Sequence, residues 1–258
     1  MPPGSRVLAA VALLIVGGAA AETSPEGRQS GFDLMSRDNQ AMQRDDTANP
    51  GMLWVQDGAD LWTARAGGAG KSCADCHGEA AGSMRGAAAR YPDWDTEAGM
   101  PIDLQGRINQ CRTTRQAERP FALEGRELLA LTAYVANQSR GMPIAPSGDP
   151  RLGPARERGA ELFRRRIGQL NLSCAACHDD NAGKRLGSAR IPQAHPTGYP
   201  LYRLEWQSLG SLQRRFRNCI TGVRAEPYPL GAPEYVELEL YLMSRARGMP
   251  VETPAVRP

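Results

Sequence analysis

Two copies of one short cysteine motif constrain this chain more than any other feature. The pattern Cys-x-x-Cys-His occurs once at positions 73–77 and again at 174–178. It is the attachment pattern of c-type haem, because two thiols one helical turn apart can add to the two vinyl groups of a porphyrin while the adjacent imidazole ligates the iron. A zinc site would need a second ligand pair at regular spacing, and a thioredoxin-like motif would need a βαβ context and no histidine. The sequence therefore predicts two covalently bound haem c groups, held by Cys73, Cys76 and His77, and by Cys174, Cys177 and His178.

The repeat extends beyond the motifs. Gly58 and Gly159 are separated by 101 residues (159 − 58), and the same offset relates Trp62 to Phe163 and Cys73 to Cys174. A constant offset of this kind indicates an internal duplication. The glycine before each motif is expected where that helix crosses the last helix of its domain closely. Apolar residues at helical spacing predict those last helices over 124–137 and 233–245, each followed by Gly-Met-Pro.

These patterns predict an all-α fold, with two duplicated domains of the class I cytochrome c type behind an N-terminal extension. We expect no strands, because no alternating pattern of useful length is present. The expected divisions are a signal peptide over 1–21, a polar extension over 22–50, a first cytochrome c domain over 51–146, a linker over 147–153 and a second domain over 154–258.

The N-terminal residues predict export of the protein from the cytoplasm, and the composition limits the kinds of partner it is expected to have. Arg6, an apolar run over 7–16 and a cluster of small residues are typical of a secretory signal, so we expect a periplasmic protein. No later stretch approaches about 18 apolar residues, so no membrane span is predicted. The net charge of +3 falls to +2 without Arg6, which does not suggest a nucleic-acid partner. Aromatic residues make up only 6% of the chain, so haem is expected to fill much of each core.

One cysteine per domain remains after the haem motifs are assigned. Cys111 and Cys219 each follow a short amphipathic stretch, and each has an arginine four residues earlier, Arg107 and Arg215. We favour a distal axial ligand in each domain. A disulfide between the two cysteines and a buried inert thiol in each domain are the alternatives. An ordinary electron-transfer cytochrome would use a methionine, and the candidates are Met84, Met100, Met142 and Met249.

Two further features differ between the domains. His195 lies in a proline-flanked loop and is expected to be a surface residue rather than a ligand. Cys76 and Cys111 are 35 residues apart (111 − 76), whereas Cys177 and Cys219 are 42 apart (219 − 177). The seven extra residues are expected to shape a mouth through which substrate reaches one haem only.

The chain resembles the SoxA family, the diheme subunits of SoxAX cytochromes that act in periplasmic thiosulfate oxidation. The resemblance is carried by the two haem motifs, the paired cysteines, and the stretches 214–219 and 245–250. It implies that Cys111 ligates the first iron and that Cys219, carrying a persulfide sulfur, is the active-site cysteine and ligates the second. It also implies that Arg215 binds substrate.

The resemblance further implies an L-cysteine S-thiosulfotransferase. Its reaction joins thiosulfate oxidatively to a cysteine thiol of a carrier protein, SoxYZ, and passes two electrons to haem, and a monohaem SoxX-like partner completes a heterodimer. Arginine suits a thiosulfate dianion, since its planar fork of donors matches an oxyanion. The sequence places further positive charge nearby at Arg214, Arg217, Arg224, Arg245 and Arg247.

Alternatives remain open from the residues alone. A diheme electron-transfer cytochrome without sulfur chemistry would have histidine and methionine as iron ligands. A diheme peroxidase is disfavoured, because both domains offer a strong distal ligand. Arg107 has the same offset from Cys111 that Arg215 has from Cys219, so Arg215 could serve a structural purpose common to both domains.

Overall fold

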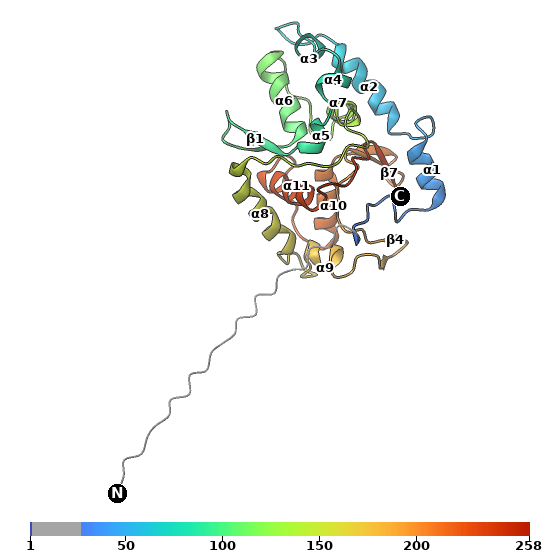
Figure 1. The fold of residues 1–258 in the computed structure, drawn as a ribbon, viewed down its shortest axis with the longest axis vertical. Coiled ribbons are helices and arrows are strands. Elements are labelled where there is room, and N and C mark those ends of the chain that lie inside the picture. The colour runs from blue at the N-terminus through green and yellow to red at the C-terminus, as the bar shows by residue number, and fades with distance from the viewer. Residues whose placement is uncertain (2–26) are drawn as a thin grey trace.

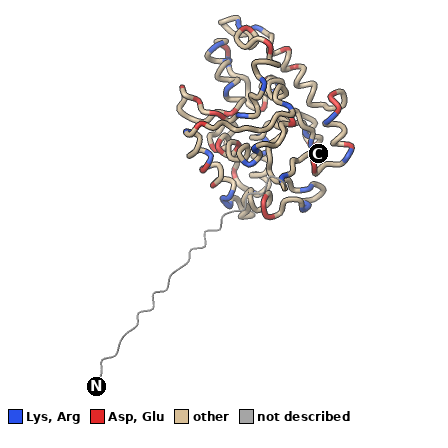
Figure 2. The backbone as a smooth tube through the Cα atoms, viewed as in Figure 1, with Lys and Arg blue, Asp and Glu red and all other residues tan. Residues whose placement is uncertain are grey.

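The computed structural model describes residue 1 and residues 27–258, which form two helical lobes and an N-terminal arm (Figure 1). The predicted signal peptide and the first residues of the predicted extension lie outside the described residues. Within the described part of the chain, no helix has the length and apolar character needed to cross a membrane. Acidic and basic residues are interspersed along both lobes (Figure 2).

Each lobe surrounds one haem motif, and the lobes share a first helix, a haem-motif helix, a hairpin, a cysteine helix and a last helix in that order. The first lobe contains α2 Met52–Thr63, α3 Ala74–His77, α4 Ala80–Ser83, α5 Ala87–Arg90, β1 Asp93–Asp95, β2 Met100–Ile102, α6 Leu104–Arg115 and α7 Arg126–Asn137. The second contains the 3₁₀ turn η2 Pro150–Leu152, α8 Gly153–Arg164, α9 Cys174–His178, β3 Arg185–Leu186, β4 Ala189–Arg190, β5 Leu201–Arg203, β6 Ser208–Gly210, α10 Leu212–Gly222, α11 Pro233–Arg245 and β7 Ala255–Arg257.

The predicted close helix crossings are confirmed in both lobes. A Cβ added to Gly58 of α2 would lie 2.2 Å from the carbonyl oxygen of Ala130 in α7, and one added to Gly159 of α8 would lie 2.0 Å from that of Glu237 in α11. Real Cβ atoms do not approach other atoms below 3.0 Å. Only glycine therefore allows the first and last helices of each lobe to touch backbone to backbone.

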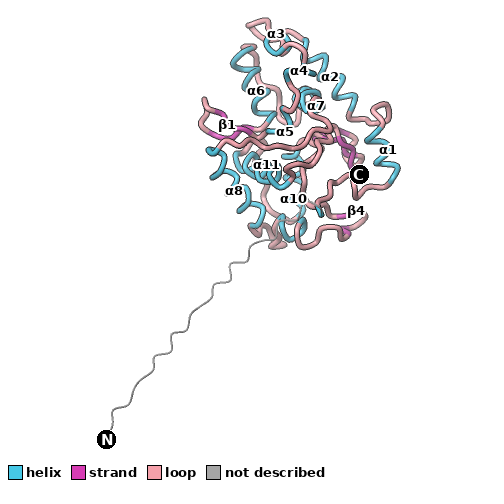
Figure 3. The backbone as a smooth tube through the Cα atoms, viewed as in Figure 1, coloured by secondary structure: helices cyan, strands magenta, loops and turns pink. Residues whose placement is uncertain are grey.

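The prediction of a purely helical fold is wrong, because short strands lie between the helices (Figure 3). The antiparallel hairpin of β1 and β2 recurs as β5 and β6, and β7 extends the second hairpin in parallel. These strands are two or three residues long, too short to show an alternating pattern. A third hairpin, β3 with β4, occurs in the second lobe only, and it lies within the segment that carries the seven extra residues.

The duplicated hairpins pack across the lobe boundary. Trp94 of β1 lies against a second-lobe cluster that contains Ala155 and Leu240. Its counterpart Tyr202 of β5 lies against Trp54 and other residues of α2 and α7 in the first lobe. Each lobe therefore completes part of the other's core. The two lobes pack directly against each other and are not connected by the linker alone.

The Gly-Met-Pro segments that follow α7 and α11 pair with each other about a pseudo-twofold axis. Gly141 N donates to Val251 O at 2.8 Å, and its counterpart Gly248 N donates to Ile144 O at 2.7 Å. Pro143 and Pro250 face each other in an antiparallel bridge at the centre. The repeated tripeptide thus ends each helix and also joins the lobes.

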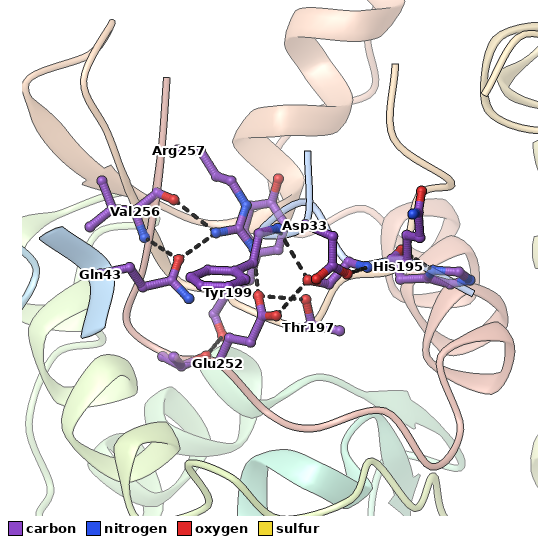
Figure 4. Close-up of polar contacts among 12 residues, drawn as sticks. Asp33, Gln43, His195, Thr197, Tyr199, Glu252, Val256 and Arg257 are labelled. Atoms are coloured by element: carbon purple, nitrogen blue, oxygen red, sulfur yellow. Dashed lines mark hydrogen bonds and ion pairs between the residues drawn. The ribbon is translucent and has the colours of Figure 1, made fainter. Parts of the chain in front are cut away.

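The N-terminal arm packs on the second lobe and on the C-terminal tail (Figure 4). Its helix α1, Arg37–Arg44, presents Gln43, whose side-chain oxygen accepts from Val256 N at 3.0 Å. Glu252 of the tail accepts from Ser30 of the arm at 2.6 Å and from Thr197 at 3.0 Å. Residues 27–50, the described part of the polar extension expected from the sequence, are therefore folded against the tail and the second lobe.

The candidate haem centres and the Cys219 site

The first haem motif meets helix α6 in the core of the first lobe. Cys73 packs against a buried cluster that contains Trp62, and Leu104 and Ile108 of α6 pack against the same cluster. Burial raises the pKa of the Cys73 thiol, and the nearby Cys111 raises it further. The structure thus brings the predicted distal residue Cys111 to the motif that it is expected to serve.

The second motif forms the short helix α9, whose N-terminus is capped by Ser173 through a 3.0 Å bond from Ala176 N. Cys174 packs on the core cluster that also holds Leu212 and Phe216 of α10. Burial, followed by the nearby Cys219, raises the pKa of the Cys174 thiol to about 11. Cys219 therefore lies beside the second motif, as Cys111 lies beside the first.

The proximal histidine of the second lobe is oriented by the backbone. His178 Nδ1 lies 2.6 Å from the carbonyl oxygen of Pro192. Burial lowers the pKa of His178, which favours a neutral ring with its proton on Nδ1. That tautomer leaves the Nε2 lone pair free for a metal. Asp179, the next residue, is fixed by Arg245 of α11 at 2.6 Å.

These residues fit covalently attached haem. In each motif the two thiols lie one turn apart on a helix, the histidine follows directly, and a further cysteine approaches from another helix. None of the six cysteines forms a disulfide, and Cys111 and Cys219 lie beside different haem motifs, so the alternative of a disulfide between them is wrong. Both residues are only half-buried, which does not favour the alternative of deeply buried, inert thiols.

Arg215 and Arg107 have different surroundings despite their equal offsets from cysteine. Arg107 lies 4.0 Å from the buried carboxylate of Asp95 and also contacts Gln110. Arg215 is half-buried one turn before Cys219 on α10. Within residues 27–258, its side chain makes no hydrogen bond or ion pair to an acidic partner. The protein contacts of the two arginines therefore differ, and a purpose common to both, such as pairing a haem propionate, stays an alternative.

A family model described as the cytochrome c domain of SoxA/TsdA matches residues 57–144 and again residues 158–251. The chain belongs to the SoxA/TsdA cytochrome c family. The SoxA subunit of the L-cysteine S-thiosulfotransferase from Pseudaminobacter salicylatoxidans is 40% identical over 240 residues, which cover 91% of this chain and 84% of that subunit. The corresponding subunit from Paracoccus pantotrophus is 35% identical over 228 residues, 88% of this chain and 78% of its own.

The crystal structure of SoxXA from P. pantotrophus has the same fold, with a TM-score of 0.86 and 34% identity over 90% of this chain and 87% of that one. The predicted resemblance to SoxA and the predicted repeat of a cytochrome c domain are thus confirmed. Membership of a cytochrome c family implies haem c as the cofactor.

The methionine candidates of this SoxA-type chain differ in their surroundings. Met249 is buried with Ile144 between the lobes, and Met100 is 39% exposed on β2. Met142 lies at the end of the first lobe, where its methyl group faces Gly86. Met84 packs in the same first-lobe cluster as Cys73. In the second lobe, Cys219 is the candidate ligand that lies beside the motif.

The prediction that His195 is a surface residue is wrong. Its side chain is 9% exposed, and Nδ1 lies 2.8 Å from the carbonyl oxygen of Gln29 in the arm. The neighbouring Gln193 accepts from Gln29 N at 2.7 Å. The flanking prolines indicate a loop, but no pattern in the sequence indicates that the arm covers this loop.

Sequence reasoning also missed Tyr199 and Arg203, which lie near Cys219. Burial raises the pKa of Tyr199, while the positive charge of Arg215 opposes this rise. Burial and the charge of Arg215 both lower the pKa of Arg203. Neither residue belongs to a haem motif or to a cysteine helix, and only the fold brings the loop and β5 to the site.

Proposed function

We propose that this chain is the SoxA subunit of an L-cysteine S-thiosulfotransferase, as its relatives are named. The reaction joins thiosulfate to a carrier cysteine: S₂O₃²⁻ + R–SH gives R–S–S–SO₃⁻ + H⁺ + 2e⁻. The observation that carries the proposal is the placement of Cys219 and Arg215 on one helix beside the second haem motif, with Arg215 lacking an acidic partner among the described residues.

Two haem c groups would be held by the residues already described. Cys73, Cys76 and His77 would hold the first, with Cys111 as its distal ligand. Cys174, Cys177 and His178 would hold the second, with Cys219 as its distal ligand. When bound, haem supplies a one-electron acceptor.

Arg215 binds the sulfonate end of thiosulfate, because a guanidinium offers parallel donors to an oxyanion. The Cys219 sulfur accepts the sulfane sulfur of thiosulfate, with loss of two electrons, to give Cys219–S–S–SO₃⁻. A persulfide sulfur on Cys219 would extend its reach without changing this balance. The carrier thiolate then attacks the sulfane sulfur that came from thiosulfate and forms R–S–S–SO₃⁻, while Cys219 leaves as its thiolate, or as its persulfide anion if it carries the extra sulfur.

The partners and compartment follow the same proposal. The SoxXA structure contains a second protein, SoxX, and we expect a SoxX-like monohaem cytochrome to form a heterodimer with this chain. The thiol donor is a SoxYZ-like carrier, and the compartment is the periplasm. The proposed domain limits are 51–146 and 154–258, and each contains one of the two segments, 57–144 and 158–251, that the family model matches.

The test is carrier modification by the holoprotein with its monohaem partner, followed by the intact mass of the carrier. The wild type is expected to form the S-thiosulfonate in the presence of thiosulfate and an electron acceptor. Cys219→Ala should abolish the product, since the sulfur that accepts thiosulfate is gone. Full carrier modification by Cys219→Ala, with haem content unchanged, would defeat the proposal.

A further inference from the structure

The internal repeat continues through the hairpins at a new offset. Cis peptide bonds precede Pro92 and Pro200, β1 corresponds to β5, and Cys111 corresponds to Cys219, each separated by 108 residues (200 − 92; 219 − 111). The offset rises from 101 at the haem motifs to 108 here, because the second lobe carries seven extra residues in between. At this offset Arg107 corresponds to Arg215, and Asp95 corresponds to Arg203.

In the first lobe, the Asp95 carboxylate compensates the charge of Arg107. Its side chain is 3% exposed and lies 4.0 Å from Arg107. It also accepts from Gln110 Nε2 at 2.6 Å and from Glu97 N at 3.0 Å. These contacts join β1 to the cysteine helix α6 and place a carboxylate beside Arg107.

In the second lobe, the same position carries the opposite charge. The Arg203 side chain is 15% exposed, and its buried Nε has no hydrogen-bond partner in the described structure. Its acidic contact is Glu205 at 3.2 Å, which is 64% exposed, and exposed pairs of this kind contribute little. Arg203 and Arg215 therefore bring two positive charges to the position where the first lobe has an ion pair.

Arg203 is held in place from two sides. It is the last residue of β5 and is paired with Ser208 of β6. The strand β6 ends shortly before α10 begins at Leu212. The Arg203 guanidinium lies over the ring of Trp206, 5.2 Å from the centroid, and Arg214 lies over the same ring at 4.3 Å. A cationic group anchored in this way is pre-organised for an anion.

We propose that Arg203 is a second oxyanion-binding residue, which together with Arg215 holds the sulfonate group of thiosulfate beside Cys219. The inference rests on the proposed function and adds a substrate contact that the first lobe cannot make, because Asp95 occupies the corresponding position. A haem propionate is also an oxyanion, so the test separates the two sources.

The experiment measures KM and kcat for thiosulfate with the holoprotein, its monohaem partner and the carrier. Arg203→Gln should raise KM about ten- to a hundredfold with kcat nearly unchanged, since it removes a charge-assisted contact. Arg203→Asp, which recreates the acid of the first lobe opposite Arg215, should raise KM further. Arg156→Gln, which removes a positive charge from the exposed face of α8, is the matched control and should leave KM unchanged.

Glu205→Gln gives a test that does not depend on loss of stability. It removes the exposed acid that competes for Arg203, so KM should fall by up to a few-fold. An Arg203→Gln protein with a KM within about twofold of wild type would overturn the inference.

Redox titration of each variant without thiosulfate separates the two sources of the oxyanion. A shifted potential of the second haem with unchanged KM would assign Arg203 to a propionate and also overturn the inference. Absence of wild-type turnover would instead defeat the proposed function.

Discussion

Substitution of Gly159 by alanine tests whether the backbone contact between α8 and α11 holds the second lobe together. The new Cβ would lie 2.0 Å from Glu237 O, so the helices must separate by about 1 Å to reach the 3.0 Å limit of real contacts. A gap of that size forfeits a quarter to a half of the dispersion energy of the atoms it parts. Overpacking of this kind costs about 1–3 kcal/mol, partly offset by about 1 kcal/mol of better helix propensity.

Gly153→Ala is the matched control, because Gly153 belongs to the same helix and a Cβ there meets nothing within 4 Å. The control receives the gain in propensity without the clash. The two variants should therefore differ by the overpacking term, about 1–3 kcal/mol, or about 2–12 °C in Tm for a chain of this size. Thermal unfolding of the holoproteins, followed by circular dichroism, measures the difference. Equal melting temperatures for the two variants would refute the close-crossing argument.

Two further predictions concern the lobe interface and the arm. Burial and the charge of Asp103 raise the pKa of Glu239, which lines a cavity of about 60 Å³ between the lobes. The folded state then keeps a proton that the unfolded chain releases, so stability falls as pH rises through the ordinary carboxyl pKa. The Tm gain of Glu239→Gln over wild type should grow as the pH rises above the ordinary glutamate pKa of about 4, and a gain that does not change with pH would contradict this. Gln193→Ala removes bonds to Gln29 N and Gly27 O and should speed proteolysis of the arm about tenfold, whereas an unchanged cleavage rate would show that these bonds do not hold it.

The sequence identified the parts of this fold that have strong local patterns. The apolar spacing over 233–245 predicted α11 with its observed limits, Pro233–Arg245. The glycines at 58 and 159 predicted the helix crossings, because a close approach restricts residue choice more than any other local feature. The repeat of the haem motif predicted two lobes. The matching positions of Cys111 and Cys219 in the repeat predicted that each cysteine lies beside the haem motif of its own lobe.

Features that depend on distant pairing could not be read in the same way. The three-residue strands have no period, and β7 pairs with β5 about fifty residues earlier in the chain. His195 looked exposed because its neighbours along the chain are loop residues, whereas its burial comes from the arm. Arg203 looked like one of many arginines, and its importance appears only when the seven extra residues are located and the position is aligned with Asp95.

Cys219, beside the second haem motif, is proposed to provide the sulfur that reacts with thiosulfate. The most direct measurement exposes the oxidised holoprotein and its monohaem partner to thiosulfate labelled with radiosulfur in the sulfane position, and then maps the label to peptides. Label is expected on the Cys219 peptide, where a carrier thiol releases it, and no label is expected on the Cys111 peptide. Label absent from the Cys219 peptide while the carrier is still converted at the normal rate would contradict it.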